Sequence, residues 1–238
     1  MPPKLKTELE RQHLRTLIID AARELFVSRG VDAVTMRELA KRIGYSATSI
    51  YLHFADKEAL LRAICDTDFL ALATSLKNVM LIVNPVDRLH ALGQSYAAFA
   101  LTHPNHYRLM FMTERTPCEP QLSSLQRNSV EQDTYYQLKT VVNDMHAAAH
   151  FRDDLKDADL IAQTIWAGMH GVCSLQISMS EDKWVNWCNI SARLQLMQQV
   201  SPNHAGCHYD IRNGARVGGQ RGLEGANGLN FIEGTPIS

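Results

Sequence analysis

A run of side chains that can form hydrogen bonds lies between residues 46 and 57. Its members carry hydroxyl, phenol, imidazole and ammonium groups beside one small residue: Ser46, Ala47, Thr48, Tyr51, His53 and Lys57. Small polar side chains can reach base edges in a DNA major groove about 12 Å wide, whereas aromatic and cationic groups suit the phosphates. This spacing therefore favours hydrogen bonding to duplex DNA.

Two short predicted helices position these side chains. Thr35 and Glu38 have the spacing of a capping box, so the first of the helices is expected to start after Thr35. Gly44 stands where the chain must reverse, a position that often needs positive φ. Ser46 then caps a second helix that is expected to extend to His53. The pattern is typical of a helix-turn-helix, although a helical hairpin inside a bundle would explain the same apolar spacing.

Residues 18–61 resemble the N-terminal domain of the TetR family of bacterial transcriptional regulators. The resemblance is carried by Ala21-Ala22, Leu25-Phe26, Gly30, Val34-Thr35, Leu39-Ala40, Ile43-Gly44, Ser46, Ile50-Tyr51, His53-Phe54, Lys57-Glu58 and Leu60-Leu61. It implies a DNA-binding domain of three helices in which seven side chains line the DNA: Thr35, Tyr45, Ser46, Thr48, Tyr51, His53 and Lys57. Thr48 and Leu52 depart from the common family pattern, so the resemblance does not predict the operator sequence.

The charge of the chain is unevenly distributed. The net charge of the 238 residues is -1, but residues 1–62 hold eleven Lys and Arg against eight Asp and Glu. The basic end therefore coincides with the predicted DNA-reading end, as expected for a nucleic-acid binder. A hydrophobic content of 45% and a charged content of 21% predict a folded, soluble chain with a real core.

The cysteines and the apolar segments indicate a cellular compartment. Five cysteines occur without a CxxC pair, which favours neither a disulfide framework nor a zinc site, and a reducing cytoplasm suits them. The sequence has no secretory apolar region and no stretch near the ~20 apolar residues of a membrane span. We therefore expect a cytoplasmic protein without a cofactor, a metal or a membrane contact.

The pattern along the chain predicts four segments. These are a flexible basic arm (1–12), a helix-turn-helix domain (13–56), a helical effector-binding and dimerisation domain (57–200) and a Gly-rich, disordered tail (201–238). The arm either reaches a minor groove or is a solvated terminus. In the tail, His204, Cys207 and His208 are a weak zinc pattern, because they lack a fourth ligand.

The predicted fold is all-α, because no convincing period-two strand pattern appears. The first helix is expected at residues 13–29, and the helix that follows the DNA-reading helices at about 56–80. The remaining helices are expected at 86–103, 104–112, 122–150, 158–178 and 182–200, with proline in the first turn of the 104–112 helix. By family resemblance, the 56–80 helix would act as a lever between a bound effector and the DNA-reading domain.

The body also resembles a TetR-family C-terminal domain with a Trp-His-Gly signature. The resemblance rests on His103-Pro104, on Tyr107 to Phe111, and on Trp166 to Gly171. Aromatic and methionine side chains at helical spacing are usually core, yet ligand sites in helical bundles are lined by the same types. The predicted ligand-binding residues are Phe99, Tyr107, Met110, Trp166, Met169, His170 and Cys173. His170 is either such a ligand group or a core imidazole bonded to a backbone carbonyl.

The last two predicted helices carry more apolar surface than one small body needs. Family resemblance implies that they form a homodimer interface, with these candidate residues: Leu160, Ile161, Thr164, Ile165, Gly168, Val172, Trp184, Trp187, Ile190, Leu194 and Met197. Two-fold symmetry would place two readers on a pseudo-palindrome, ~34 to 36 Å apart or at a related spacing. A self-contained bundle with the tryptophans inside is the alternative.

Taken together, these features predict a homodimeric, DNA-binding transcriptional regulator. Repression, with release by a small apolar effector, is the expectation from the family. The alternatives are a helical-bundle enzyme and an adaptor protein without DNA binding. Cys173 near His170 is weak evidence for an enzyme, because no orienting carboxylate or oxyanion donor is visible. An adaptor would leave the polar surface of residues 46–53 without a role.

Overall fold

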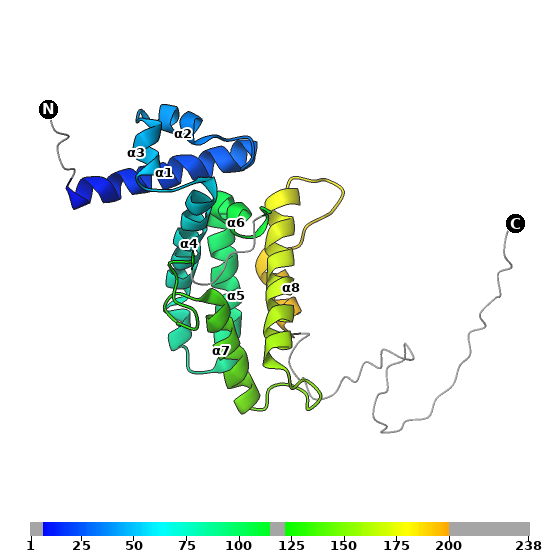
Figure 1. Cartoon of the computed structure of the whole chain (residues 1–238). Coiled ribbons are helices and arrows are strands. Elements are labelled where there is room, and N and C mark those ends of the chain that lie inside the picture. Colours follow the sequence, from blue (N-terminus) through cyan, green and yellow to red (C-terminus); the bar gives the residue numbers. More distant parts are fainter. Residues whose placement is uncertain (1–6, 115–121, 200–238) are drawn as a thin grey trace, which may run out of the picture. The chain divides into compact units, whose positions relative to one another are not determined.

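The computed structural model describes residues 7–114 and 122–199, and the regular elements in these ranges are all helices (Figure 1). This confirms the predicted all-α class. In chain order the elements are α1 (Glu8–Arg29), α2 (Met36–Ile43), α3 (Ala47–Tyr51), α4 (Lys57–Leu76), the 3-10 turn η1 (Val79–Leu81), α5 (Pro85–Thr102), α6 (Pro104–Phe111), α7 (Thr134–Ala147), α8 (Ala158–Met179) and α9 (Ile190–Gln199). The predicted tail, with His204, Cys207 and His208, lies outside the described residues.

The first helix starts earlier than the sequence analysis predicted. Thr7 caps α1 and forms a capping box with Glu10, so residues 8–12 are helical rather than part of a flexible arm. Glu8 and Glu10 in the first turn also suit the positive end of the helix dipole. The Thr-x-x-Glu spacing was readable in the sequence, and the prediction overlooked it. Lys4 and Lys6 of the predicted arm lie outside the described residues.

Two long predicted helices in the body are shorter in the structure. The segment expected to be helical over 122–150 forms a loop up to Asp133, which caps α7 by accepting from the Tyr136 N–H at 3.0 Å. Asn128 in this loop has φ +58°, which a helix cannot contain. The segment expected over 182–200 begins its helix only at Ile190, after Asn189 accepts from two backbone N–H groups. Two loops therefore replace helical surface in the body.

The chain builds two hydrophobic cores that meet along α4. Leu60, Leu61 and Ile64 pack with α1, α2 and α3, whereas Leu72 and Leu76 pack with the helices of the body. Figure 1 shows α1 to α3 gathered at one end of α4, with α5, α7 and α8 in the bundle below. Residue 56, the predicted boundary, is the N-cap of α4, and the two cores meet inside that helix.

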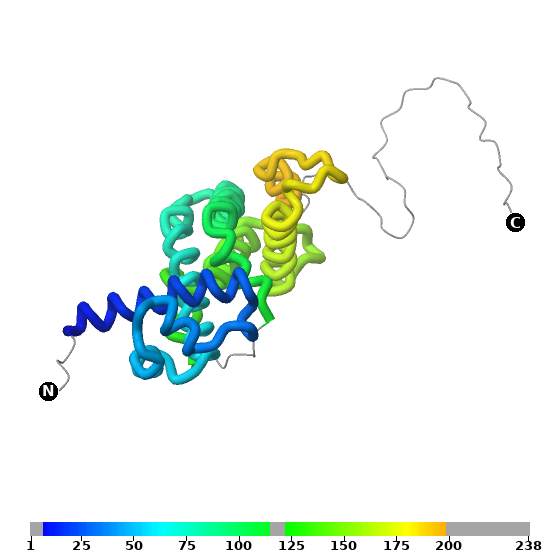
Figure 2. The backbone as a smooth tube through the Cα atoms, turned by 90° about the horizontal axis from the view of Figure 1, so that it is seen from above, coloured from blue at the N-terminus to red at the C-terminus, as the bar shows by residue number. Residues whose placement is uncertain are grey.

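Helix α6 connects the two cores. Leu109 of α6 belongs to the N-terminal core, while Tyr107 and Met110 belong to the core of the body. Figure 2 shows α1, in dark blue, crossing the end of the bundle where α6 lies. Cys65 of α4 donates its thiol hydrogen to the Leu109 carbonyl at 3.8 Å. Both α4 and α6 therefore connect the body to the N-terminal core.

No helix in the described ranges is long and apolar enough to cross a membrane.

Candidate DNA interface and ligand cavity

The turn between α2 and α3 has the predicted geometry. Thr35 caps α2: its hydroxyl accepts from the Glu38 N–H at 3.2 Å, and the Glu38 carboxylate accepts from the Thr35 N–H at 3.0 Å. Gly44 has φ +74°, in the left-handed region that glycine tolerates best. Ser46 caps α3 by accepting from the Ser49 N–H at 3.1 Å. These contacts fix the angle at which α3 leaves the turn.

The outer surface of α3 is polar and accessible. Ile50 is fully buried and anchors α3 on the N-terminal core, while Ser46 and Thr48 are exposed. The side chains of Tyr45 and Tyr51 keep 38% and 51% of their area exposed. Helix α3 thus presents hydroxyl and phenol groups to solvent, while buried Ile50 anchors it on the N-terminal core.

The remaining predicted DNA-contacting residues lie at the margins of this surface. Thr35 is exposed at the start of α2, Ala47 is half-buried against the N-terminal core, and His53 is half-buried after the end of α3. Helix α3 ends at Tyr51, two residues earlier than predicted, and the N–H groups of His53 and Phe54 bond back to the Ile50 carbonyl. His53 therefore occupies a turn rather than the expected last helical position.

Lys57 takes a structural position as well as an electrostatic one. Its ammonium donates to the carbonyl of Val31 at 2.9 Å and to that of Asp32 at 3.3 Å. Both carbonyls belong to the connection between α1 and α2. The ammonium also lies 4.0 Å from Oδ1 of Asp32, so Lys57 ties the start of α4 to this connection.

Two basic residues outside the predicted DNA-contacting set lie on α2. Arg37 and Lys41 are exposed and have no ion pair with any described residue, whereas Arg42 pairs with Glu24 at 2.7 Å. Their i, i+4 spacing places them on one face of the helix. The i, i+4 spacing of Arg37 and Lys41 could have identified them from the sequence. A pair of basic residues in the first helix of a helix-turn-helix adds positive potential beside the DNA groove.

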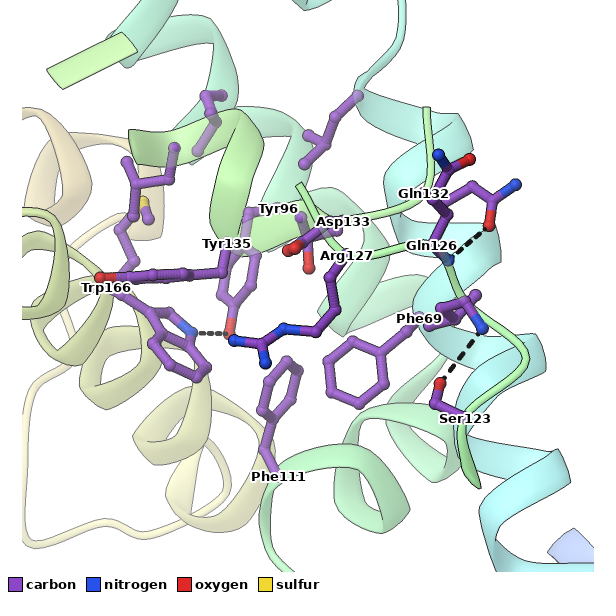
Figure 3. Close-up of a pocket in the computed structure, with 16 residues that line it drawn as sticks. Phe69, Tyr96, Phe111, Ser123, Gln126, Arg127, Gln132, Asp133, Tyr135 and Trp166 are labelled. Atoms are coloured by element: carbon purple, nitrogen blue, oxygen red, sulfur yellow. Dashed lines mark hydrogen bonds between the residues drawn. The ribbon is translucent and has the colours of Figure 1, made fainter. Parts of the chain in front are cut away.

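The body contains a cavity of about 310 Å³ among α4, α5, α6, α7, α8 and the loop before α7. Aromatic rings dominate its wall, and Figure 3 shows them converging from several helices: Phe69, Tyr96, Phe111, Tyr135 and Trp166. The other lining residues are Leu76, Leu92, Ser123, Leu125, Gln126, Arg127, Gln132, Asp133, Thr134, Leu138 and Met169. The volume is at the lower end for small-molecule sites.

Only part of the predicted ligand-binding set lines this cavity. Trp166 and Met169 contribute to its wall. The other five are placed elsewhere: Phe99, Tyr107, Met110 and Cys173 are buried in the core of the body, and half-buried His170 lies behind the wall. The predicted set did not include the aromatic residues Phe69, Tyr96, Phe111 and Tyr135, which packing of the bundle brings together. It also lacked the polar loop, because that segment was expected to be helical.

A chain of hydrogen bonds leads from the cavity wall into the core. The Trp166 indole N–H donates to the Tyr96 hydroxyl at 3.4 Å, and the hydroxyls of Tyr96 and Tyr107 are 3.1 Å apart. The Tyr107 hydroxyl lies 2.6 Å from Nδ1 of His170. His170 is half-buried, and its partner is a phenol rather than the backbone carbonyl that the core interpretation required.

Burial influences the protonation of the side chains in this hydrogen-bonded series. It lowers the pKa of His170 and raises the pKa of Tyr107, and it raises the pKa of Tyr96 to about 12. With its hydrogen on Nε2, the neutral imidazole accepts at Nδ1 from the Tyr107 hydroxyl, and the Tyr107 oxygen can then accept from Tyr96. Burial also raises the pKa of the Cys173 thiol to about 12, which opposes formation of a nucleophilic thiolate.

The face predicted for dimerisation divides into buried and exposed residues. Ile161, Ile165 and Leu194 point into the core of their own chain, and Met197 packs against Gly168. Trp187 donates from its indole to the Met179 carbonyl at 3.0 Å. The large exposed apolar side chains of this region are Leu160, Leu175, Met179, Trp184, Val185 and Leu196, and Trp184 is 95% exposed.

Among the described residues, no group of three His, Cys, Asp or Glu side chains is placed to hold a metal ion.

Two parts of the chain match known families. Residues 18–64 match the bacterial regulatory proteins of the tetR family, and residues 89–180 match a Tetracyclin repressor-like C-terminal domain. The first match includes the whole α2-turn-α3 surface. The second includes most of the cavity wall. The Trp-His-Gly subtype stays a prediction, because the second match is to the broader C-terminal class.

Individual relatives and solved structures agree with these matches. The chain is 28% identical over 155 residues to the HTH-type transcriptional repressor KstR2 of Mycobacterium tuberculosis, an alignment that covers 62% of this chain and 74% of KstR2. It is 40% identical over 57 residues to the HTH-type transcriptional regulator UidR of Escherichia coli, covering 24% and 29% of the two chains. A TetR family transcription regulator from Marinobacter aquaeolei VT8 has the same fold, with a TM-score of 0.66 at 13% identity over 83% of this chain and all of the other.

The fold and the helix-turn-helix surface, together with these matches, define a DNA-binding transcription regulator rather than an enzyme. The chain belongs to the TetR family.

Proposed function

We propose that this regulator is a homodimeric repressor that leaves its operator when a small, mostly apolar molecule enters the cavity of the body. The observation that carries the proposal is the exposed Thr48 and Tyr51 surface on a helix anchored by buried Ile50. A regulator of this kind acts where the chromosome is, so we also propose a cytoplasmic location.

The proposed DNA contacts follow from the geometry of α2 and α3. Ser46, Ala47 and Thr48 at the start of α3 would meet base edges, because the first residues of a recognition helix enter the major groove. The groups proposed to hold the backbone are Thr35, Tyr45, Tyr51, His53 and Lys57, with Arg37 and Lys41 of α2 added to them. Phosphate contacts of this type set orientation and give affinity that falls with salt.

The proposed dimer uses the exposed apolar side chains of α8, α9 and the loop between them. Leu160 and Leu175 lie on the outer side of α8, and a Cβ at Gly171 would meet nothing within 4 Å, so this side of the helix is uncovered. Trp184 and Leu196 extend the surface along the chain. Large apolar side chains left exposed in this way suit an association surface. A two-fold dimer would supply the two readers that paired half-sites require.

Release by an effector would act through α4 and α6. Phe69 of α4 and Phe111 of α6 both line the cavity, and their rings meet edge to face with centroids 5.4 Å apart. Asp68 of α4 bonds to Arg23 of α1, and Leu109 of α6 packs in the same core as α1. The Cys65–Leu109 and His106–Asp68 bonds join α4 to α6. A ligand that separated Phe69 from Phe111 would therefore move the supports of the DNA-reading helices. It would release the DNA only if it binds the displaced arrangement more tightly than the DNA-bound one.

Repression is proposed because one relative of this chain is a repressor. KstR2 is a transcriptional repressor, and its alignment with this chain extends beyond the helix-turn-helix into the body.

The experiment that tests this proposal is gel retardation of duplex fragments taken from around the chain's own gene. The wild-type chain should retard at least one fragment at low salt, with affinity falling steeply between 50 and 200 mM salt, as for proteins that make about six or more phosphate contacts. Thr48→Ala and Tyr51→Ala should abolish retardation of that fragment.

The matched control is Thr67→Ala on α4. Thr67 is also an exposed helical threonine, but its hydroxyl donates to the Ala63 carbonyl at 2.7 Å and it lies outside the helix-turn-helix. This variant should retain DNA binding. Flat affinity across the salt range, or retention of binding in both α3 variants, would contradict the proposed interface.

A further inference from the structure

The cavity of the body is polar on one side and aromatic on the other. All of its polar side chains except the hydroxyl of Tyr96, that of Tyr135 and the indole of Trp166 come from the loop and helix start at residues 123–134. The aromatic and aliphatic wall comes from the helices opposite. A ligand that fills this space therefore places its apolar body among the rings and its polar end against the loop.

Most polar groups of this loop already have partners inside the protein. The Asp133 carboxylate accepts from the N–H groups of Asn128 and Tyr136, both at 3.0 Å, so it is occupied as the cap of α7. The Gln132 side-chain oxygen accepts from the Gln126 N–H at 2.9 Å. The Ser123 hydroxyl donates to Asp66 at 2.9 Å. These groups hold the loop and are not directed at a guest.

Arg127 is the exception on this wall. Its side chain lines the cavity, and Figure 3 shows it pointing from the loop toward the aromatic rings. It forms no hydrogen bond or ion pair with any residue that the structure describes, although it carries a permanent positive charge with five donors. Arg127 is also an exposed residue, so part of it reaches solvent while its side chain lines the cavity.

We propose that the effector is an amphipathic monoanion, with an apolar body among the rings of Phe69, Phe111 and Trp166 and a carboxylate held by the Arg127 guanidinium. This inference rests on the proposed function and names the ligand class of the same cavity. A guanidinium recognises a carboxylate through two parallel hydrogen bonds, which a neutral alcohol or amide cannot reproduce. The cavity volume of 310 Å³ is about ten times the volume of one water molecule in the liquid.

The loop that carries Arg127 is also hydrogen-bonded to α4. A carboxylate bound at Arg127 is therefore coupled to the helix that supports the DNA-reading end. The Ser124 backbone N–H and hydroxyl donate to Oδ2 of Asp66 at 2.7 and 2.8 Å, and Ser123 donates to Oδ1. Asp66 lies on α4, two residues before Asp68, which holds α1. A ligand that draws Arg127 toward the cavity thus pulls on the part of α4 that supports the DNA-binding domain.

Calorimetric titration of the full chain tests this inference with two matched pairs of probes. The pairs are decanoate with 1-decanol, and 2-naphthylacetate with 2-naphthylacetamide. At least one acid should bind the wild type roughly ten- to a hundredfold more tightly than its neutral partner, as expected for hydrogen bonds to a charged group. Arg127→Gln should remove that preference while leaving the affinity for the neutral partner unchanged, and Arg127→Lys should retain part of it.

The matched control is Arg152→Gln, which removes another exposed arginine of the body, one that pairs with Asp154 outside the cavity. This variant should keep the wild-type preference for the acid. Equal affinity for acid and neutral partner, failure of both acids to bind, or an unchanged preference in Arg127→Gln would overturn the anionic-ligand proposal. Retardation of the operator fragment by the unliganded chain is measured on the same samples, so loss of DNA binding itself would count separately against the proposed function.

Discussion

Arg23 of α1 and Asp68 of α4 form a buried two-point ion pair between the DNA-reading helices and the bundle. Nη2 of Arg23 lies 2.7 Å from Oδ1 of Asp68, and Nε lies 3.2 Å from Oδ2. The exposed fractions are 7% and 1%. Burial by itself lowers the pKa of Arg23, but the hydrogen bonds and charges of Asp68 and Asp20 outweigh it and raise that pKa. Nδ1 of His106 on α6 lies 2.9 Å from the same Asp68 oxygen. One carboxylate therefore joins α1, α4 and α6.

Asp68→Asn should lower the free energy of unfolding by about 3 kcal/mol, because removal of one partner leaves a buried guanidinium without full compensation. The low end of the usual range is expected, since Arg23 keeps its 2.7 Å contact with Asp20. Urea unfolding followed by circular dichroism measures the change. Asp154→Asn, which breaks an exposed pair with Arg152, is the control and should have little effect. Equal stability of the Asp68 variant and the wild type would refute a stabilising role for the pair.

His170 gives the stability a pH dependence of defined sign. Burial lowers its folded-state pKa below the unfolded value of about 6.5, so the unfolded chain binds the proton more readily. The contribution of neutral His170 is therefore present above pH 6.5 and is lost as the pH falls toward the lowered folded-state pKa. The free energy of unfolding should fall more steeply from pH 7 to pH 5 in the wild type than in His170→Gln. Identical slopes in urea titrations at each pH would show that this imidazole is not held neutral.

Gly44 is required by the backbone of the turn rather than by space. A Cβ there would meet nothing within 4 Å, yet φ is +74°. Gly44→Ala should therefore cost about 1 to 2 kcal/mol through left-handed strain, while Gly44→Asn should cost less because asparagine tolerates this region. Thermal unfolding of the two variants compares them directly. A costlier asparagine than alanine would point to a steric constraint instead.

Association through α8, α9 and their connecting loop can be tested with charge. Leu175→Glu and Trp184→Glu place a carboxylate on the exposed apolar surface, where neither side chain supports the core of its own chain. Both variants should shift the mass in light scattering from dimer to monomer and weaken DNA binding in parallel. Leu81→Glu is the control, since Leu81 is 77% exposed in η1 and lies away from α8 and α9 in the chain. A monomeric wild type, or a dimer that tolerates both changes, would contradict this interface.

The DNA-reading end was predictable from the sequence because local signals determine it. The Thr35 and Glu38 capping box, the Gly44 turn and the Ser46 cap each act over three or four residues, and all three have the expected geometry. The same kind of signal at Thr7 and Glu10 would have placed the start of α1 correctly.

The ligand cavity was harder to predict because it depends on long-range packing. Phe69 and Trp166 are almost a hundred residues apart in the sequence, and only the bundle brings them to one wall. Apolar spacing also gave no way to separate buried Tyr107 from the cavity-lining Tyr96, since both lie at helical core positions. Arg127 was missed for a different reason: its segment carries enough helix-compatible residues to hide a loop that Asp133 and Asn128 define.

Two copies of the α2-turn-α3 surface are proposed to read DNA together. This is tested by selection of duplexes from a random library by the purified full-length chain at low salt. We expect enrichment of a pseudo-palindrome whose half-sites are centred about one helical turn, or a related spacing, apart, and no such enrichment by Tyr51→Ala. A library that stays random with the wild type, or an enriched site without two-fold symmetry, would contradict it.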